Sequence, residues 1–140
     1  MNSAFDISTS GLIAQRTRLD AISGNIANMS SLRNENGELA PYQARFVVFE
    51  TDSEMTNGNG AQGVKVSSVE TSQVDPSYRY QPDHPLAIED GKWKGYVAYP
   101  SINMTAEMVN ALEATRAYEA NIGAMEISKS MGQQTLRILV

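Results

Sequence analysis

The feature that most constrains the fold of this chain is its C-terminal segment, in which no proline follows Pro100. A largely apolar stripe recurs there in alternating steps of three and four residues, the spacing that keeps side chains on one side of an α-helix. Its members are Met104, Met108, Ala111, Thr115, Tyr118, Ile122, Met125, Lys129, Gly132, Leu136 and Leu139. A helix of about 35 residues is about 50 Å long. We therefore expect it to pack against an element of similar length, with Asn103 or Thr105 as its N-cap.

The opposite end of the chain supplies a candidate partner between Asn2 and Met29. Apolar residues repeat there at heptad spacing, as in a coiled-coil seam. The repeat runs through Phe5, Leu12, Leu19 and Ile26, with Ile22 and Met29 in the second position of the later heptads and the polar Ser8 and Gln15 in the earlier ones. This pattern predicts a second helix with an imperfect seam.

Gly11 and Gly24 interrupt this N-terminal helix, and glycine lowers intrinsic helix stability by about 1 kcal/mol at each position. Two interpretations are open. Either the segment has weak helix propensity, or the missing side chains allow another part of the backbone to come close.

The middle of the chain changes from helical to strand-like spacing. Strand candidates are residues 42–50, 63–70, 77–81 and 95–99, which are rich in β-branched and aromatic residues. Turn residues separate them at Asn36-Gly37, residues 57–60, Asp75-Pro76, residues 82–85 and Asp90-Gly91. This part of the sequence predicts a small set of β-hairpins.

The resulting fold class is α+β, with long terminal helices that form a coiled-coil-like core and a small hairpin-rich insertion between them. We expect an N-terminal helix within residues 1–31, a β-rich region over 32–101 and a C-terminal helix within 102–140. Several apolar residues lie off the C-terminal seam, namely Val109, Leu112, Ile127 and Ile138. A helix that is apolar on more than one face is usually buried among several helices, which favours assembly with other chains.

Composition excludes several functional classes. The formal net charge of -5 argues against nucleic-acid binding, which needs a basic face. The absence of cysteine excludes disulfides and thiolate chemistry. The sequence has no long apolar run of the kind that spans a membrane and no secretory signal, since Asp6, Gln15 and Arg16 interrupt the start. A site outside the cytoplasm would therefore require a different export route.

No motif predicts catalysis, a metal or a cofactor. His84 is the only histidine and lies between two prolines in PDHP, where a rigid loop is the simpler interpretation than a metal site. The sequence GNGAQG at 58–63 matches a dinucleotide-binding pattern, but a polar run precedes it and a strand follows, so a hairpin loop is favoured. Glu89 and Asp90 are adjacent loop carboxylates that more often face solvent.

Both ends of the chain resemble one protein family. SGLIAQRTRLDAISGNIAN at 10–28 and PYQARFVVF at 41–49 resemble the N-terminal signature of bacterial flagellar rod and hook proteins. Residues 80–131, from YQPDHP through EMVNALEATRAYEAN to SKSM, resemble the C-terminal half of a proximal rod subunit. The similarity extends over essentially the whole chain, and its length fits the proximal rod, because the distal relatives carry larger middle domains.

Two positions depart from the family pattern. The chain is longer by about four residues around Gly91-Lys92-Trp93-Lys94, and Ser101 replaces the asparagine usual before the last helix. Trp93 either makes a contact only on assembly or folds back on the β region.

The resemblance implies a structural subunit that assembles with itself and with related subunits into a helical tube. This tube transmits torque for swimming, forms part of the export channel and lies in the periplasm as the rod of the basal body. Its implied partners are FlgB, FlgF, FlgG and FliE, together with the flagellar export apparatus in transit, which needs no cleaved signal peptide. The alternative is another coiled-coil subunit of a type III secretion assembly.

We predict an assembly interface on the two helices and charge pairs beside it. The interface comprises Phe5, Leu12, Leu19, Ile22, Asn25, Ile26, Asn28, Met104, Met108, Tyr118, Asn121, Ile122, Met125, Leu136 and Leu139. The flanking charges are Arg16, Arg18, Asp20, Glu113, Arg116 and Glu119, which would set partner and register.

Overall fold

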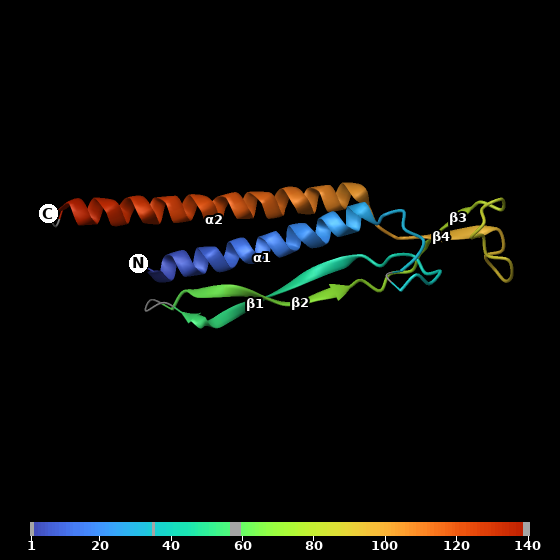
Figure 1. Cartoon of the computed structure of the whole chain (residues 1–140), viewed down its shortest axis with the longest axis horizontal. Coiled ribbons are helices and arrows are strands. Elements are labelled where there is room, and N and C mark those ends of the chain that lie inside the picture. The colour runs from blue at the N-terminus through green and yellow to red at the C-terminus, as the bar shows by residue number, and fades with distance from the viewer. Residues whose placement is uncertain (1, 35, 57–59, 139–140) are drawn as a thin grey trace.

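The computed structural model describes residues 2–34, 36–56 and 60–138. Its elements follow the order α1 (Asn2–Ala27), β1 (Arg45–Thr56), β2 (Gln62–Thr71), β3 (Ser77–Tyr80), β4 (Tyr96–Tyr99) and α2 (Met104–Ile138). Figure 1 shows α1 and α2 side by side along the long axis, the β1–β2 hairpin beside α1, and β3–β4 beyond one end of the helices. The chain is α+β, as the sequence predicts.

Asparagine side chains form hydrogen bonds at the start of α2 and at the end of α1. Asn103 is the N-cap of α2, because its Oδ1 accepts hydrogen bonds from the backbone N–H groups of Thr105 and Ala106 at 3.0 and 3.2 Å. Helix α1 ends at Ala27, slightly before the predicted Met29. There the Asn28 side chain donates from Nδ2 to the Gly24 carbonyl at 2.9 Å, and the Asn28 backbone N–H donates to the same carbonyl at 3.0 Å.

The two helices run antiparallel. Arg18 contacts Glu113 and Asn25 contacts Glu107, so positions rise along α1 as they fall along α2. A Cβ at Gly11 would lie 3.0 Å from the Asn121 side chain. At Gly11 the missing side chain therefore makes room for a side chain of α2, whereas the interpretation of close approach predicted a backbone segment there.

The β1–β2 hairpin is antiparallel and lies along α1. Arg45 pairs with Thr71 at one end, and the register shifts at a bulge between Val48 and Phe49. Among the described residues, hydrogen bonds join this hairpin to α1 at Val64 and at Arg45. The Val64 N–H donates to Ser10 Oγ at 3.1 Å, and the backbone of Arg45 bonds to Asn25.

The loop between these strands contains the GNGAQG sequence. Residues 57–59 lie outside the described residues, and Gly60 has a φ of 79°. Strand β2 begins at Gln62 and includes Gly63, so a strand stands where a dinucleotide site would need a helix.

Strands β3 and β4 form a separate antiparallel pair that is covered by aromatic rings. The Trp93 ring stacks on Tyr78 with centroids 4.2 Å apart and meets Tyr96 edge-on at 5.5 Å. Trp93 therefore folds back on the β region, which was one of its two predicted positions. It remains 37% exposed. Val97 of β4, which pairs with Arg79 of β3, is 2% exposed.

Candidate functional site

The chain buries few apolar side chains and exposes many. Among the described residues, the apolar side chains that are nearly fully buried are Ala14, Ile22, Val97 and Ala114. Large apolar residues are exposed over most of α2, namely Met104, Met108, Val109, Leu112, Ile122, Ile127, Met131, Leu136 and Ile138. Large apolar surfaces of this kind mark interaction sites on soluble proteins.

The predicted seam of α1 is only partly covered by the chain itself. Ile22 is 6% exposed. The heptad residues Phe5, Leu12, Leu19 and Ile26 are all half-buried. They therefore lie at the margin of the contact with α2 and leave apolar surface available.

The face of α2 that packs on α1 differs from the predicted stripe. It is formed mainly by small or polar residues, with Ala114 fully buried and Asn110, Ala117 and Asn121 half-buried. The predicted stripe is centred about a quarter of a turn away. Small side chains occupy the inner face of α2 because they let the two helix axes approach closely, whereas methionine and isoleucine would hold the axes apart.

The predicted interface residues on α2 therefore have two different environments. Tyr118, Asn121 and Met125 are half-buried towards the inner side. The exposed members are Met104, Met108, Ile122 and Leu136, with exposures of 45%, 53%, 38% and 61%. Leu139 lies outside the described residues.

Two asparagines of the predicted interface are used within the chain. Asn25 is 2% exposed and bonds to β1 and α2. Asn28 is half-buried, and its Oδ1 accepts a hydrogen bond from Ser31 Oγ at 3.0 Å.

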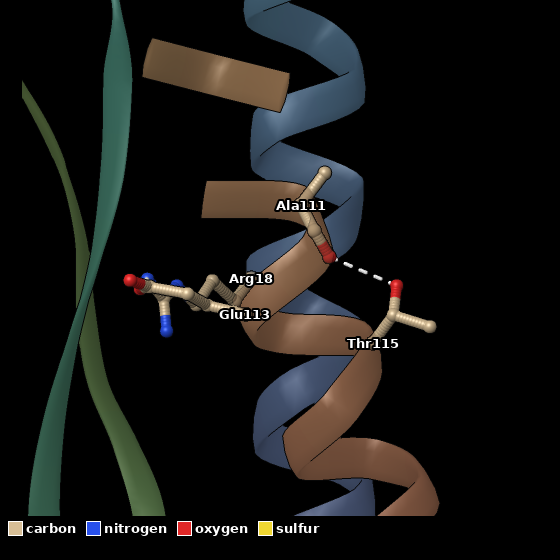
Figure 2. Close-up of polar contacts among 4 residues, drawn as sticks. All are labelled: Arg18, Ala111, Glu113 and Thr115. Carbon is tan, nitrogen blue, oxygen red and sulfur yellow. Dashed lines mark hydrogen bonds and ion pairs between the residues drawn. The ribbon is translucent and has the colours of Figure 1, made fainter. Parts of the chain in front are cut away.

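One pair among the predicted charges is formed. Arg18 Nη2 lies 3.3 Å from Glu113 Oε2, with side-chain exposures of 30% and 62%. Figure 2 shows this pair on one side of the helices and Thr115 on the other, where its hydroxyl donates to the Ala111 carbonyl at 2.8 Å. An exposed ion pair contributes at most about 1 kcal/mol, so it orients the helices weakly.

The remaining predicted charges make no ion pair with other described residues. They are Arg16, Asp20, Arg116 and Glu119, and all four are exposed.

A groove between α1 and the hairpin was not predicted from the sequence. Its volume is about 400 Å³, and its lining includes Ile13, Met55, Val64 and Asp52. Ile13 is 62% exposed and lies off the heptad seam. The sequence feature that indicates this groove is the apolar pair Leu12-Ile13. Adjacent residues of a helix point in different directions, so Ile13 cannot lie on the same face as Leu12.

The remaining candidate sites have ordinary structural environments. The Leu86 N–H donates to His84 Nδ1 at 3.1 Å, and the Ala87 N–H donates to the His84 carbonyl at 2.9 Å, so the histidine organises its own turn. Across residues 2–34, 36–56 and 60–138, no group of three or more histidine, cysteine, aspartate or glutamate side chains is arranged to hold a metal ion.

Comparison with known families matches the two helical ends. Residues 5–31 match the family described as "Flagella basal body rod protein". Residues 94–138 match the family described as "Flagellar basal body rod FlgEFG protein C-terminal". These segments contain almost all of α1, together with β4 and α2.

Full-length relatives extend the match to the whole chain. Flagellar basal-body rod protein FlgC of Borreliella burgdorferi is 39% identical over 149 aligned residues, which cover 98% of this chain and 96% of the relative. FlgC of Salmonella typhimurium is 40% identical over 134 residues, covering 96% and 94%. FlgC of Bacillus subtilis is 36% identical over 147 residues, covering 96% and 95%.

The chain belongs to the FlgC family of flagellar basal-body rod proteins. It is therefore a structural protein of the flagellar basal body and not an enzyme. None of its described helices has the length and hydropathy needed to cross a membrane.

Proposed function

We propose that this chain is a subunit of the proximal rod and assembles there with copies of itself and with other rod proteins into a helical tube. The exposed apolar surface of α2 carries the proposal. Leu112 is 60% exposed and Met108 is 53% exposed, although both lie within α2. Complete burial of a leucine side chain contributes about 1.5–3 kcal/mol, so covering Leu112 would add about 1–2 kcal/mol to assembly.

The two predicted seams supply a second part of the interface. The predicted seam of each helix lies next to the face that packs on the other helix. With about 100° of rotation per residue, and because the two helices run antiparallel, both seams project to the same side of the helix pair. Half-buried Leu12 and Leu19 of α1 would then join Met108 and Ile122 of α2 in one apolar surface. A neighbouring subunit's helix covering this surface would complete a coiled-coil-like core, the arrangement known as domain 0 in rod proteins.

Different surfaces on the two sides of a subunit favour an open assembly. A head-to-tail interface that does not close into a ring generates a helical tube. Closely packed apolar contacts are poorly compressible, which suits a shaft that transmits torque. In this arrangement the terminal helices over residues 1–31 and 102–140 form the assembly core that surrounds the export channel, and residues 32–101 form a smaller outer part.

The partners that the family resemblance implies are FlgB, FlgF, FlgG and FliE, in addition to the flagellar export apparatus during transit. The rod would lie in the periplasm, and the subunit would reach it without a cleaved signal peptide. Neither a nucleic acid nor a small-molecule substrate has a role in this account. Stiffness and shape are the functional properties.

Leu112 provides the test of this proposal. Leu112→Asp would bury a carboxylate in the assembled rod, which costs several kcal/mol, while leaving the exposed position of the free subunit unstrained. We expect loss of motility and of the subunit from isolated basal bodies, with normal cellular protein level. Leu112→Met is the matched control, because it keeps an apolar side chain of similar volume. Normal incorporation of the aspartate variant would refute the assigned surface.

A further inference from the structure

The inner contact between α1 and α2 is built from small side chains that repeat. Ala111, Ala114 and Ala117 follow one another in steps of three on α2, and Gly11 and Ala14 are buried on α1. Small side chains form shallow ridges between helices. Moving α2 by three residues, about 4.5 Å along its axis with a rotation of about 60°, therefore replaces alanine by alanine at the centre of this contact. Apolar packing alone selects weakly among neighbouring registers.

Asn25 is the buried polar residue at this contact, and its hydrogen-bonding capacity is fully used. An asparagine side chain has two N–H donors and an oxygen with two acceptor sites. Its Nδ2 donates to the Arg45 carbonyl at 2.8 Å and to Glu107 Oε2 at 3.1 Å. Its Oδ1 accepts from the Arg45 N–H at 2.7 Å and from the Tyr42 hydroxyl at 3.3 Å. One side chain thus joins α1 to the first residue of β1 and to the first turn of α2.

Other polar contacts between the helices constrain the register less. The Arg18–Glu113 pair is exposed and therefore screened by solvent. Asn121 lies against Gly11, but its Nδ2 donates to the Ala117 carbonyl of its own helix at 2.9 Å. The same three-residue slip would place Asn110 or Met104 where Glu107 now accepts from Asn25. With Met104 there, a buried N–H would lose its acceptor, which is costly.

We propose that Asn25 is a positioning residue that sets the register of α1, α2 and β1 relative to one another. A single buried asparagine fixes register in the same way in coiled coils, where misaligned pairing leaves its polar atoms unsatisfied. The consequence for assembly rests on the proposed function. Register determines where the exposed apolar residues of α2 lie relative to the hairpin, and hence the shape that a neighbouring subunit meets.

Spin-label distances measure this register directly, and the absence of native cysteine allows labels at chosen positions. A label pair at Asp20 and Arg116, both exposed, reports α1 against α2. A pair at Asp20 and Glu70 reports α1 against the hairpin, because Glu70 is exposed on β2. Both pairs are introduced by cysteine substitution in the full chain and measured by pulsed electron paramagnetic resonance.

Three variants separate the two connections that Asn25 makes. Glu107→Ala removes the acceptor on α2, so α2 can slip along α1 by about three residues, or about 4.5 Å, and the α1–α2 distance distribution should broaden or shift, while the α1–hairpin distance stays unchanged. Glu107→Gln retains an acceptor oxygen and should change neither distance. Asn25→Leu removes both connections and should change both distances.

The readout distinguishes positioning from stabilisation alone. Unchanged distance distributions in folded Glu107→Ala and Asn25→Leu proteins would overturn the proposal, even if their thermal stability fell. If Asn25→Leu does not fold, the comparison of Glu107→Ala with Glu107→Gln decides alone by the same criterion. Because no motility measurement enters, failure here would leave the proposed rod function untouched.

Discussion

Adding a methyl group at Gly11 tests how closely the two helices approach. A Cβ there would lie 3.0 Å from both Nδ2 and Oδ1 of Asn121, which is tighter than ordinary van der Waals contact. Asn121 is held in place by its hydrogen bond to the Ala117 carbonyl. Alanine stabilises a helix by about 1 kcal/mol relative to glycine, whereas overpacking costs about 1–3 kcal/mol. We therefore expect Gly11→Ala to lower the free energy of unfolding by about 0–2 kcal/mol.

Gly24 is the matched control on the same helix. A Cβ at Gly24 would meet only the Tyr42 hydroxyl within 4 Å, at 3.8 Å, so the helix-propensity gain should be retained. Gly24→Ala should raise the free energy of unfolding by about 1 kcal/mol. Urea denaturation followed by far-ultraviolet circular dichroism measures both changes, and two-state behaviour makes the midpoints comparable.

A double-mutant cycle identifies the neighbour responsible. In an Asn121→Ala background the space beside position 11 opens, so Gly11→Ala should become stabilising by about 1 kcal/mol. Equal stabilisation by Gly11→Ala and Gly24→Ala in the native background would refute the close approach of α2 at Gly11. Equal destabilisation by Gly11→Ala with and without Asn121 would show that another contact opposes the methyl group.

Substitutions at three further residues probe separate parts of the fold. Asn103→Ala should lower the free energy of unfolding by about 1 kcal/mol through loss of the α2 cap, and Asn103→Ser should recover most of it, as urea denaturation would reveal. Tyr78→Ala should shift Trp93 emission to longer wavelength and increase its quenching by acrylamide, because it removes the stacked ring; unchanged emission would contradict the stacking. Glu113→Gln should change the free energy of unfolding by less than about 1 kcal/mol, because both side chains of the Arg18–Glu113 pair are accessible to solvent. A larger loss would mean that the pair is shielded from solvent.

Element types and approximate positions could be predicted because their signals are local. Heptad spacing indicated α1, and the proline-free C-terminal segment indicated α2, which begins after the cap at Asn103. Asp90-Gly91 marked the turn before β4, and Gly91 has a φ of 95°, a conformation that glycine adopts readily. Such features depend on neighbouring residues alone, so one sequence is enough to reveal them.

The face of α2 that meets α1 could not be predicted in the same way. Spacing rules assign the largest apolar residues to the inner side, which favoured Met108 and Ile122. In the chain, Ala114 and Ala117 occupy that side and the larger residues remain exposed. When a helix is apolar on several faces, which face is inner depends on the axis separation that its own partner allows. Gly11 and Ala14 are the buried small residues of α1 at this contact, and the bulky face of α2 stays exposed.

The contacts of Asn25 escaped prediction for a related reason. Its partners Arg45 and Glu107 are distant in sequence and come together only through the tertiary fold. A polar residue near a heptad seam is equally compatible with a surface position, and only its exposure of 2% separates the two cases.

Chemical protection at position 112 tests the central claim most directly. The chain lacks cysteine, so Leu112→Cys carries the only thiol and should react rapidly with a maleimide in the free subunit, where Leu112 is 60% exposed. In basal bodies purified from motile cells that produce this variant, we expect the same thiol to be strongly protected, because neighbouring rod helices cover α2. Unfolding the purified basal bodies should restore reactivity and confirm that the thiol was intact. Equal reactivity in the free subunit and in the intact basal body would contradict the assignment of the exposed face of α2 as the assembly surface.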